Sequence, residues 1–249
     1  ISWPKVVTNA ASNVTYNSAT SGGSISIQGN YSIMERGVCY GTSLNPDLTG
    51  THVISGSGAG SYTSDISGLN NGTTYYLRAY ATSNVETEYG NNISINTVAL
   101  VMGDYYSGGI VFYLDGSGGG LVCAPFDQSN AAEWGCDGTT IGGTGTGIGI
   151  GVANTAAIVS GCNETGIAAK ICNDLVLNGY SDWFLPSKDE LNLIYQNLKI
   201  AGIGGFASAY YWSSSEYSSY VAWGQLLTNG LQYTNDKSIP VNVRAVRAF

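Results

Sequence analysis

Short segments of alternating apolar and polar residues recur along the first hundred positions, separated by stretches rich in glycine, asparagine and serine. This alternation has the two-residue period of a β-strand that buries one face. Six or seven short strands in about 100 residues are typical of a sandwich, so the pattern predicts an all-β unit over residues 1–98. The expected strands contain Val6–Val7, Ser24–Ile27, Gly37–Tyr40, Tyr62–Ile66, Tyr75–Ala81 and Ile93–Ile95.

The pattern changes near residue 99, where longer apolar runs and helical spacing appear. Residues 108–115 and 120–125 read as a hairpin across a glycine-rich turn. Residues 167–178 carry apolar side chains at helical spacing and end at Gly179, a helix terminator. Ser187 and Glu190 have the spacing of a capping box that opens a second helix. Strands return after this helix, so residues 99–249 are expected to form an α+β domain.

The tail from Tyr210 to Phe249 divides into two chemically different sets. The regular set reads as scaffold: Trp212, Glu216, Ala222, Trp223, Gln225, Asn229, Gly230, Gln232, Lys237 and Val243–Phe249. The irregular set has neither a helical nor a strand period, which favours a displayed, ligand-binding surface. Its predicted binding residues are Tyr220, Val221, Gly224, Leu226, Leu227, Thr228, Leu231, Tyr233, Thr234, Asp236, Ser238, Ile239 and Val241, and Pro240 lies in the same run.

Composition restricts the partners that this chain can have. Its 249 residues include 35 Gly and 18 Tyr with only 10% charged residues, which resembles extracellular β-rich proteins. The formal net charge is −8 and only nine residues are Lys or Arg, so nucleic acid and anionic membranes are unfavourable partners. The chain has no apolar run of membrane-spanning length and begins without a leader pattern. We therefore expect a mature or trimmed ectodomain without membrane insertion.

Four of the five cysteines lie in the second half, and an even number favours disulfides formed in an oxidising compartment. Three pairings of these four are possible, of which we favour Cys136 with Cys162 and Cys123 with Cys172. The remaining Cys39 is expected to be a buried thiol. A zinc site is disfavoured because no CxxC pair occurs.

The sequence contains few residues in patterns typical of catalytic or metal sites. The only histidine, His52, lies in the first half, so the second half cannot form a Ser-His-Asp or Cys-His arrangement. The glycine-rich run 142–151 lacks the closing residues of a phosphate-binding loop and is expected to be a plain loop. Asp115 lacks the neighbouring ligands of a calcium loop. The sequence therefore predicts no enzyme activity, no cofactor and no bound metal.

The segment from Gly68 to Ala81 carries a resemblance to a known fold. Leu69, Gly72 and Tyr75 match the L-x-x-G-x-x-Y tyrosine corner of fibronectin type III domains. The resemblance implies that Tyr75, Leu77, Ala79 and Ala81 point inward, and Tyr76, Arg78 and Tyr80 outward. Modules of this kind mostly serve as spacers, so no function follows from the first half alone.

The second half resembles a bacterial domain family that includes the C-terminal domain of the Legionella collagen-like adhesin. The motifs that carry the resemblance are GGIVFYLDG, AEWGC, AKICNDLVLNGYSDWFLPSKDELNLIYQNL, GGFASAYYWSSSEY and VRAVRAF. Membership implies a C-type-lectin-like fold, usually extracellular, and in the adhesin an affinity for sulfated glycosaminoglycans. This half has six basic residues against twelve acidic ones, so we do not transfer that ligand. The fold also resembles formylglycine-generating enzymes, but the tail has none of the cysteines that their chemistry needs.

Some lectin-like proteins of this kind are diversified by a retroelement that randomises adenines in asparagine codons. Variable positions then take residues encoded by NNY codons, which exclude Lys, Glu, Gln, Met and Trp. Every residue of the irregular set is reachable in this way, whereas Trp223, Gln225, Gln232 and Lys237 of the regular set are not. The tail is therefore compatible with a diversity-generating retroelement.

These features predict a secreted or surface-displayed bacterial protein, or a phage virion protein, that binds a ligand through its C-terminal face. The expected partner is a cell-surface protein, glycoprotein or carbohydrate. The alternative is a structural subunit of a bacterial surface fibre or pilus, which self-associates through the same apolar surfaces.

Overall fold

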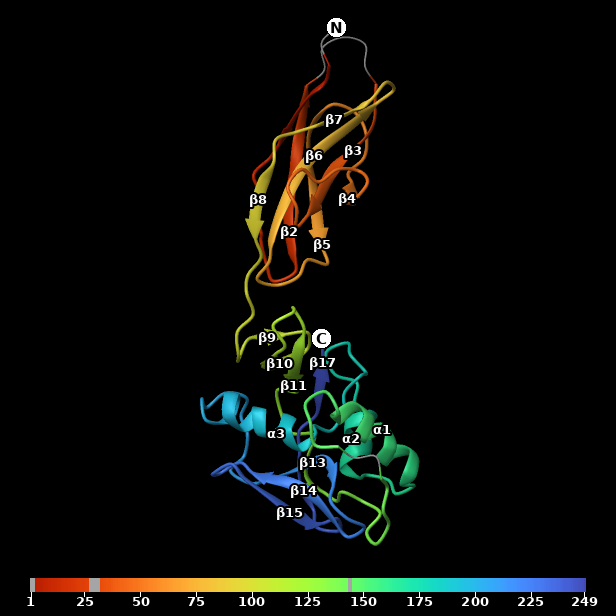
Figure 1. Ribbon diagram of the computed structural model, residues 1–249, viewed down its shortest axis with the longest axis vertical. Coiled ribbons are helices and arrows are strands. Elements are labelled where there is room, and N and C mark those ends of the chain that lie inside the picture. The colour runs from red at the N-terminus through yellow and green to blue at the C-terminus, as the bar shows by residue number, and fades with distance from the viewer. Residues whose placement is uncertain (1–2, 27–31, 143–144) are drawn as a thin grey trace. The chain divides into compact units, whose positions relative to one another are not determined.

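The computed structural model describes residues 3–26, 32–142 and 145–249 (Figure 1). The chain divides into two compact units, Ile1–Leu100 and Val101–Phe249. None of the helices among the described residues has the length and apolar character needed to cross a membrane.

The first unit is a β-sandwich, as its alternating pattern predicts. One sheet has the order β1-β2-β5, and the other has the order β4-β3-β6-β7 with β8 also paired to β6. The core between the sheets contains Val6, Ile25, Val38, Ile66 and Leu77. Ile27, expected at the end of the second strand, lies outside the described residues. The strands are β1 (Lys5–Thr8), β2 (Ser18–Ser26), β3 (Ile33–Gly41), β4 (Thr51–Ile54), β5 (Gly60–Ser67), β6 (Thr74–Ser83), β7 (Thr87–Tyr89) and β8 (Ile93–Asn96).

The tyrosine corner forms as expected. The Tyr75 hydroxyl accepts a hydrogen bond from the Asn70 backbone N–H at 3.1 Å, and Leu69 is buried in the core beneath it. This link ties the start of β6 to the loop before it, which is the function of the corner in such sandwiches. Tyr80 departs from the expectation because it is fully buried. Its ring packs edge-on against His52 and its hydroxyl donates to Glu35, so a second layer of side chains covers it.

The second unit contains one antiparallel sheet and one mixed sheet. The smaller has the order β17-β11-β10-β9, and the larger has the order β12-β16-β13-β14-β15, in which β13 and β16 are parallel. The strands are β9 (Tyr105–Tyr106), β10 (Gly109–Leu114), β11 (Gly120–Cys123), β12 (Ser129–Ala132), β13 (Tyr210–Glu216), β14 (Val221–Leu226), β15 (Leu231–Asp236), β16 (Val241–Val243) and β17 (Val246–Ala248).

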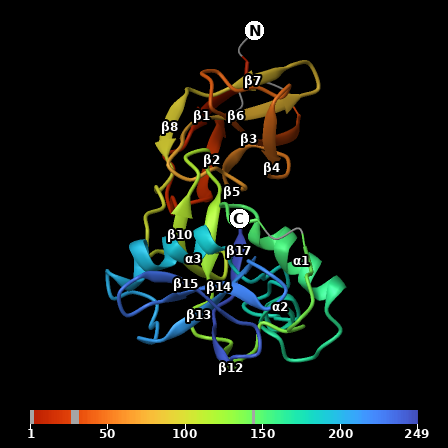
Figure 2. The ribbon, with the colours of Figure 1, turned by 60° about the horizontal axis from the view of Figure 1, so that its bottom comes forward.

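Helices occupy the middle of the second unit's sequence and flank its sheets (Figure 2). They are α1 (Gly151–Gly161), α2 (Ala168–Asn173) and α3 (Lys188–Ile194), and a π-helical turn, η1 (Tyr195–Lys199), continues α3. Helix α3 packs against β10, β13 and β14. The predicted hairpin of β10 and β11 and the predicted capping box of Ser187 and Glu190 are both confirmed.

One helix prediction needs correction, and one helix was missed. The helix expected over residues 167–178 ends after one and a half turns as α2, because its residues 174–178 turn back toward Tyr180. Helix α1 was not predicted, since its sequence GVANTAAIVSG is bounded by glycines and has no side-chain cap of its own. Its missing cap comes from a distant residue. The Glu190 carboxylate accepts a hydrogen bond from the Gly149 backbone N–H at 2.7 Å, directly before the helix.

The glycine-rich run before α1 is a loop, as expected, although residues 143–144 lie outside the described part. Side chains of the folded domain hold it by its backbone. Asn154 bonds to both the N–H and the carbonyl of Gly145, and Ser187 donates to the carbonyl of Gly147. Burial raises the pKa of Glu190 above its usual value, against the hydrogen bonds that it accepts. The Glu190 carboxyl group occupies the N-terminus of α1, which is the position that a bound phosphate would need.

Candidate ligand-binding face

The hairpin of β14 and β15 carries most of the irregular set. Its register places Trp223 opposite Thr234, Gly224 opposite Tyr233 and Gln225 opposite Gln232. Because side chains alternate across a sheet, Trp223, Gln225 and Gln232 share one face, and Gly224 and Tyr233 lie on the other.

The first of these faces is held to α3 by buried amides. The Gln225 side chain is fully buried and donates to Asn192 Oδ1 and to the carbonyl of Gly230, both at 2.9 Å. Gln232 donates to the carbonyl of Lys188 at 3.1 Å. The Lys188 ammonium lies 4.0 Å from the centre of the Trp223 ring. These regular-set residues therefore fix the hairpin on the domain.

A buried ion pair anchors the end of β15. The Lys237 side chain is fully buried and its ammonium lies 2.6 Å from a Glu216 carboxylate oxygen. Glu216 also accepts hydrogen bonds from the backbone N–H groups of Ile141 and Gly142. Burial opposes ionisation of Glu216, but these N–H groups and the ammonium outweigh it and lower its pKa. The pair thereby ties the loop before α1 to the sheet.

Two buried tryptophans connect the central strand to the segment around β12. The Trp212 indole donates to the carbonyl of Ala132 at 3.0 Å, and the Trp134 indole donates to the carbonyl of Ser213 at 2.9 Å. The Lys237 ammonium lies over the Trp134 ring at 4.6 Å. A buried indole needs a partner for its N–H, and these bonds supply one. The expected core position of Trp212 is confirmed.

The terminal VRAVRAF motif is structural for a similar reason. Arg244 is buried and pairs with Asp127 at 2.7 Å, and it also donates to the carbonyls of Ala124 and Gly204. Arg247 binds Asp182 through two hydrogen bonds, which hold the pKa of that carboxyl below its usual value. The last residue, Phe249, is half-buried rather than in the core as expected, and it packs edge-on against Tyr106.

The irregular set does not form one uniformly exposed surface. Val221, Leu226 and Tyr233 are half-buried. The exposed members lie along β15 and at the connections at both ends of the hairpin: Tyr220, Thr228, Leu231, Thr234, Asp236, Ser238, Ile239 and Pro240.

Three members of the set, predicted to be exposed, are buried. Leu227 is inaccessible and belongs to the core of the second unit, because the turn after β14 directs it inward. Val241 begins β16, an inner strand, and is 7% exposed. Gly224 lies in the middle of β14, where an added Cβ would meet the Tyr211 carbonyl oxygen at 2.7 Å and the Tyr233 hydroxyl at 2.8 Å. These three positions support the hairpin instead of contacting a ligand.

An aromatic pair marks the hairpin face that does not contact α3. Tyr210 and Tyr233 lie with ring centres 4.7 Å apart, and burial together with the nearby Tyr210 raises the pKa of Tyr233. Leu226 pairs with both Tyr210 and Leu231 across the strands. Tyr210 was not among the predicted binding residues, and Trp212, two positions further on, was assigned to the scaffold. The signal that could have found it is the alternation Tyr210-Tyr211-Trp212 at the start of a strand.

The disulfide prediction is half correct. Cys136 and Cys162 are bonded, with Cα atoms 5.8 Å apart, and they join the loop after β12 to the end of α1. The predicted bond between Cys123 and Cys172 is wrong, because both are free thiols buried in β11 and α2. Burial raises the pKa of Cys123 to about 12, which disfavours the reactive thiolate form. Cys39 is a buried thiol, as expected.

Alkylation of the unfolded, unreduced protein is expected to label three cysteines, and reduction should expose two more. Replacing Cys136 and Cys162 with serine removes a cross-link between residues 26 positions apart, which should lower the free energy of unfolding by about 3.5 kcal/mol. Mass spectrometry after alkylation and urea unfolding measure the two effects. If only one cysteine is labelled before reduction, Cys123 and Cys172 are bonded after all and their assignment as free thiols is wrong.

Metal binding finds little support among the residues that the structure describes. The one grouping of potential ligands brings together Cys136, Cys162 and Glu164. Both sulfurs are already joined in the disulfide, and Glu164 accepts a hydrogen bond from the Cys136 N–H. The grouping is therefore part of the disulfide loop.

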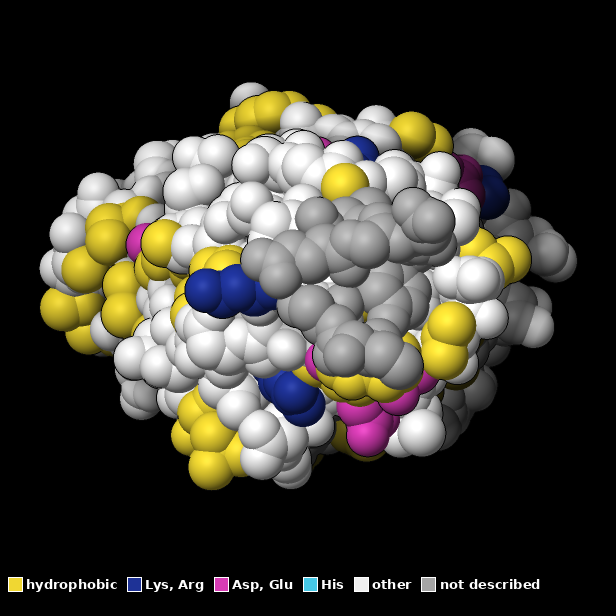
Figure 3. Space-filling model, turned by 90° about the horizontal axis from the view of Figure 1, so that it is seen from above, with side chains coloured by type: hydrophobic (Ala, Val, Ile, Leu, Met, Phe, Trp, Pro, Cys, Tyr) yellow, Lys and Arg dark blue, Asp and Glu magenta, His cyan; other side chains and the backbone are white. Residues whose placement is uncertain are grey.

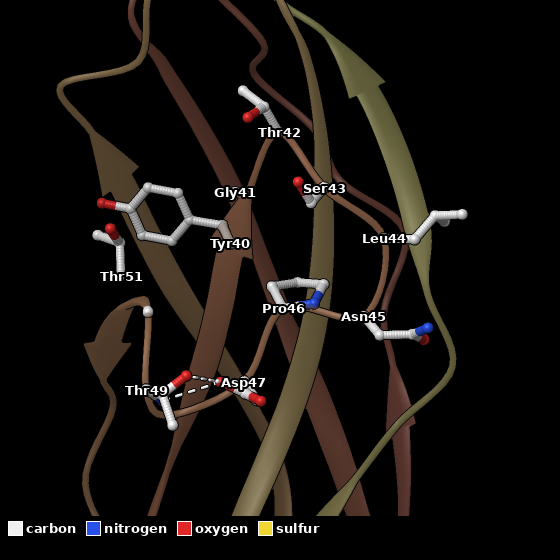
Figure 4. Close-up of a pocket in the computed structure, with 11 residues that line it drawn as sticks. Tyr40, Gly41, Thr42, Ser43, Leu44, Asn45, Pro46, Asp47, Thr49 and Thr51 are labelled. Atoms are coloured by element: carbon white, nitrogen blue, oxygen red, sulfur yellow. Dashed lines mark hydrogen bonds between the residues drawn. The ribbon is translucent and has the colours of Figure 1, made fainter.

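A hollow of about 300 Å³ lies in the first unit, along the loop between β3 and β4 (Figure 4). The Tyr40 ring stands on one side of it, beside Thr51. Asp47 is the only charged lining residue, and its carboxylate closes a turn by accepting hydrogen bonds from the N–H and hydroxyl of Thr49. The charged group of this hollow is thus engaged within its own loop, and we place the candidate site in the second unit, where the predicted binding residues lie.

No curated protein matches the chain. Solved structures that match include the sensor domain of the anti-sigma factor RsgI4 in Pseudobacteroides cellulosolvens, at 22% identity over 40% of this chain and 99% of that chain, with a TM-score of 0.31. The sixth fibronectin type III domain of a human fibronectin type III domain containing protein matches at 18% identity over 43% and 96%, with a TM-score of 0.34.

The family comparison concerns the second unit. Residues 127–247 match the model of the Lcl C-terminal domain. This range contains the ion pairs of Arg244 and Arg247, the buried tryptophans and the whole β14–β15 hairpin. Over residues 127–247 the chain is thus similar to the Lcl C-terminal domain.

Proposed function

We propose that the chain is an extracellular binding or adhesion protein whose second unit, with a C-type-lectin-like α+β architecture, recognises a ligand through the β14–β15 hairpin and its flanking connections. The family indicates a surface, adhesin-type role. The disulfide between Cys136 and Cys162 agrees with an oxidising, extracellular location.

The observation that carries the proposal is the separation of two chemistries in one short stretch. The large polar side chains of Gln225, Lys237 and Glu216 are buried and form hydrogen bonds within the fold. Large apolar residues of the same stretch are exposed instead: Tyr220 is 61%, Leu231 58% and Ile239 44% accessible. Exposure of several large apolar side chains within one stretch whose polar side chains are buried favours recognition. Tyrosine gives a large contact area at a low cost in side-chain entropy.

Binding to cells tests this proposal. A variant with Tyr220→Asn, Leu231→Asn and Ile239→Asn should lose at least tenfold in affinity, on the order expected for removing hot-spot side chains. The labelled chain would be titrated against a panel of bacterial and animal cells by flow cytometry. Fold integrity is checked by tryptophan fluorescence, because four of the five tryptophans lie in the second unit.

The matched control replaces three apolar residues elsewhere that are at least as exposed: Leu44→Asn, Val85→Asn and Val176→Asn. These residues are 63%, 61% and 74% accessible, so the solubility change is similar. Unchanged cell binding by the control and loss by the hairpin variant support the proposal. Equal binding by both variants would place the recognition surface elsewhere.

We also propose that a retroelement diversifies the exposed hairpin positions. Support comes from the chemistry of the two sets: Trp223, Gln225, Gln232 and Lys237, which NNY codons cannot encode, all make the supporting contacts described above. The proposal requires that buried Leu227, Gly224 and Val241 remain fixed or vary little. A gene neighbourhood without a reverse transcriptase and without a near-copy of the tail's coding sequence would contradict it.

The alternative function is a structural subunit of a surface fibre. The observation in its favour is that β15 ends its sheet with Leu231 exposed, and an unpaired edge strand can join a second chain. Sedimentation velocity over a wide range of concentrations separates the two functions. A binding module remains a monomer, whereas a fibre subunit gains mass as concentration rises.

A further inference from the structure

Three connections of the second unit meet at one end of its larger sheet. The β13–β14 connection contains Tyr217 and Tyr220, and the β15–β16 connection contains Ile239. The loop after β12 joins them, because the Gly138 N–H donates to the Ser219 carbonyl and an added Gly138 Cβ would lie 3.7 Å from the Tyr220 ring. Tyr217, Tyr220 and Ile239 are 64%, 61% and 44% accessible. We call these three residues and the carboxylates around them the loop-end patch.

Three exposed carboxylates lie on or beside the segments that form the loop-end patch. Asp236 pairs with Val221, the residue after Tyr220, and is exposed. Asp137 precedes Gly138 and is also exposed, and Glu164 reaches the neighbouring Cys136 N–H at 2.9 Å. None of these three carboxylates forms an ion pair with a described residue. Hydrogen bonds from Ser238 lower the pKa of Asp236, so its charge persists at neutral pH.

The cations of the second unit are already engaged. Lys237, Arg244, Arg247 and Lys170 pair with carboxylates. Lys199 donates to the Phe206 carbonyl, and Lys188 lies over Trp223. These are all six Lys and Arg residues of this unit. An anionic ligand such as a sulfated sugar would find no free cation here, whereas a cation would find unpaired carboxylates.

Resting on the function proposed above, we infer that the loop-end patch receives a cationic polypeptide segment of the partner, with lysine or arginine side chains placed between the carboxylates and over the tyrosine rings. Exposed aromatic faces attract cations, and this protein uses that contact itself, since the Lys188 ammonium lies over Trp223, which Tyr217 contacts edge-on at 5.6 Å. Opposite charge at the rim of an interface speeds association and excludes partners of the wrong charge.

The test measures binding of fluorescein-labelled repeat peptides by anisotropy, a lysine–serine repeat against a glutamate–serine repeat. The full chain should bind the lysine peptide and not the glutamate peptide. Asp137→Asn with Asp236→Asn should weaken binding about fivefold, as expected for two exposed ion pairs. Raising the salt concentration from about 0.05 M to about 0.5 M should weaken binding to the wild type more than to this variant.

The matched control is Asp47→Asn with Asp65→Asn, which removes the same charge from the first unit. Each of these carboxylates accepts a hydrogen bond from a threonine, which an asparagine oxygen can keep. Unchanged affinity in the control supports a local site. Equal weakening in both variants would reduce the effect to the net charge of the chain, and no binding of the lysine peptide would overturn the inference outright.

These outcomes are separable from the function proposed above. If the variant with Tyr220→Asn, Leu231→Asn and Ile239→Asn loses cell binding while Asp137→Asn with Asp236→Asn keeps it, the face recognises an uncharged partner. The binding function then stands and the cationic partner is rejected. If neither variant loses cell binding, the binding face itself is wrong.

Discussion

Replacing Lys237 with methionine is expected to lower the free energy of unfolding of the second unit by about 3–5 kcal/mol. The substitution keeps the apolar stem but removes the ammonium that neutralises Glu216, whose side chain is 4% exposed. The Glu216 carboxylate would then be buried with only the N–H groups of Ile141 and Gly142 as partners. Urea unfolding followed by tryptophan fluorescence measures the loss.

The double variant Lys237→Met with Glu216→Gln provides the control. It removes both charges together, so it should recover part of the stability lost by Lys237→Met alone. The wild type and the double variant should also differ in how much stability they lose as the pH falls. Because the pKa of Glu216 is lowered in the folded state from an ordinary value of 4.5, its contribution is present above that pH and is lost as the pH falls. The double variant should lack this part of the acid sensitivity. Equal stability of the single variant and the wild type would show that the pair is unimportant.

Leu227→Ala and Leu231→Ala are expected to behave in opposite ways, although both leucines belong to the irregular set. Leu227 is inaccessible within the core, so truncation leaves a cavity and should cost about 2–5 kcal/mol. Leu231 is 58% exposed, and its truncation should change stability by less than about 0.5 kcal/mol. The same unfolding experiment compares them.

The order of the two variants should be reversed when binding to cells is measured instead of stability. Leu231→Ala should weaken binding to target cells, whereas Leu227→Ala should bind normally under conditions in which it remains folded. Each leucine thus serves as the control of the other, since the substitution is identical. If Leu227→Ala is as stable as the wild type but binds cells poorly, Leu227 contacts the ligand and its placement in the core is wrong.

Local patterns predicted the parts of the fold that depend on local physics. The alternating strands of the first unit, the Tyr75 corner and the Ser187–Glu190 capping box all rest on contacts between residues close in sequence. Helix α1 was missed because the group at its N-terminus is the Glu190 carboxylate, which lies 41 residues from Gly149. Patterns read over the length of one helix do not contain both partners.

The candidate site shows the same limit. Four residues assigned to the scaffold, Gln225, Gln232, Lys237 and Arg244, all form hydrogen bonds within the fold, as expected for side chains that are costly to bury without partners. The burial of Leu227, Gly224 and Val241 was not predictable, because it depends on the turn after β14 and on the place of β16 inside the sheet. The pairing of Cys123 with Cys172 failed likewise, since parity of cysteines carries no information about distance.

The central claim is that exposed hairpin residues recognise a ligand while their buried neighbours hold the fold. Saturation mutagenesis of residues 210–249 in a displayed library measures this directly, if one library is sorted separately for protease resistance and for binding to target cells. Substitutions at Tyr220, Leu231 and Ile239 should pass the first sort and change the second, whereas those at Trp212, Gln225 and Lys237 should fail the first. Neutral behaviour of Tyr220, Leu231 and Ile239 in both sorts would contradict the account.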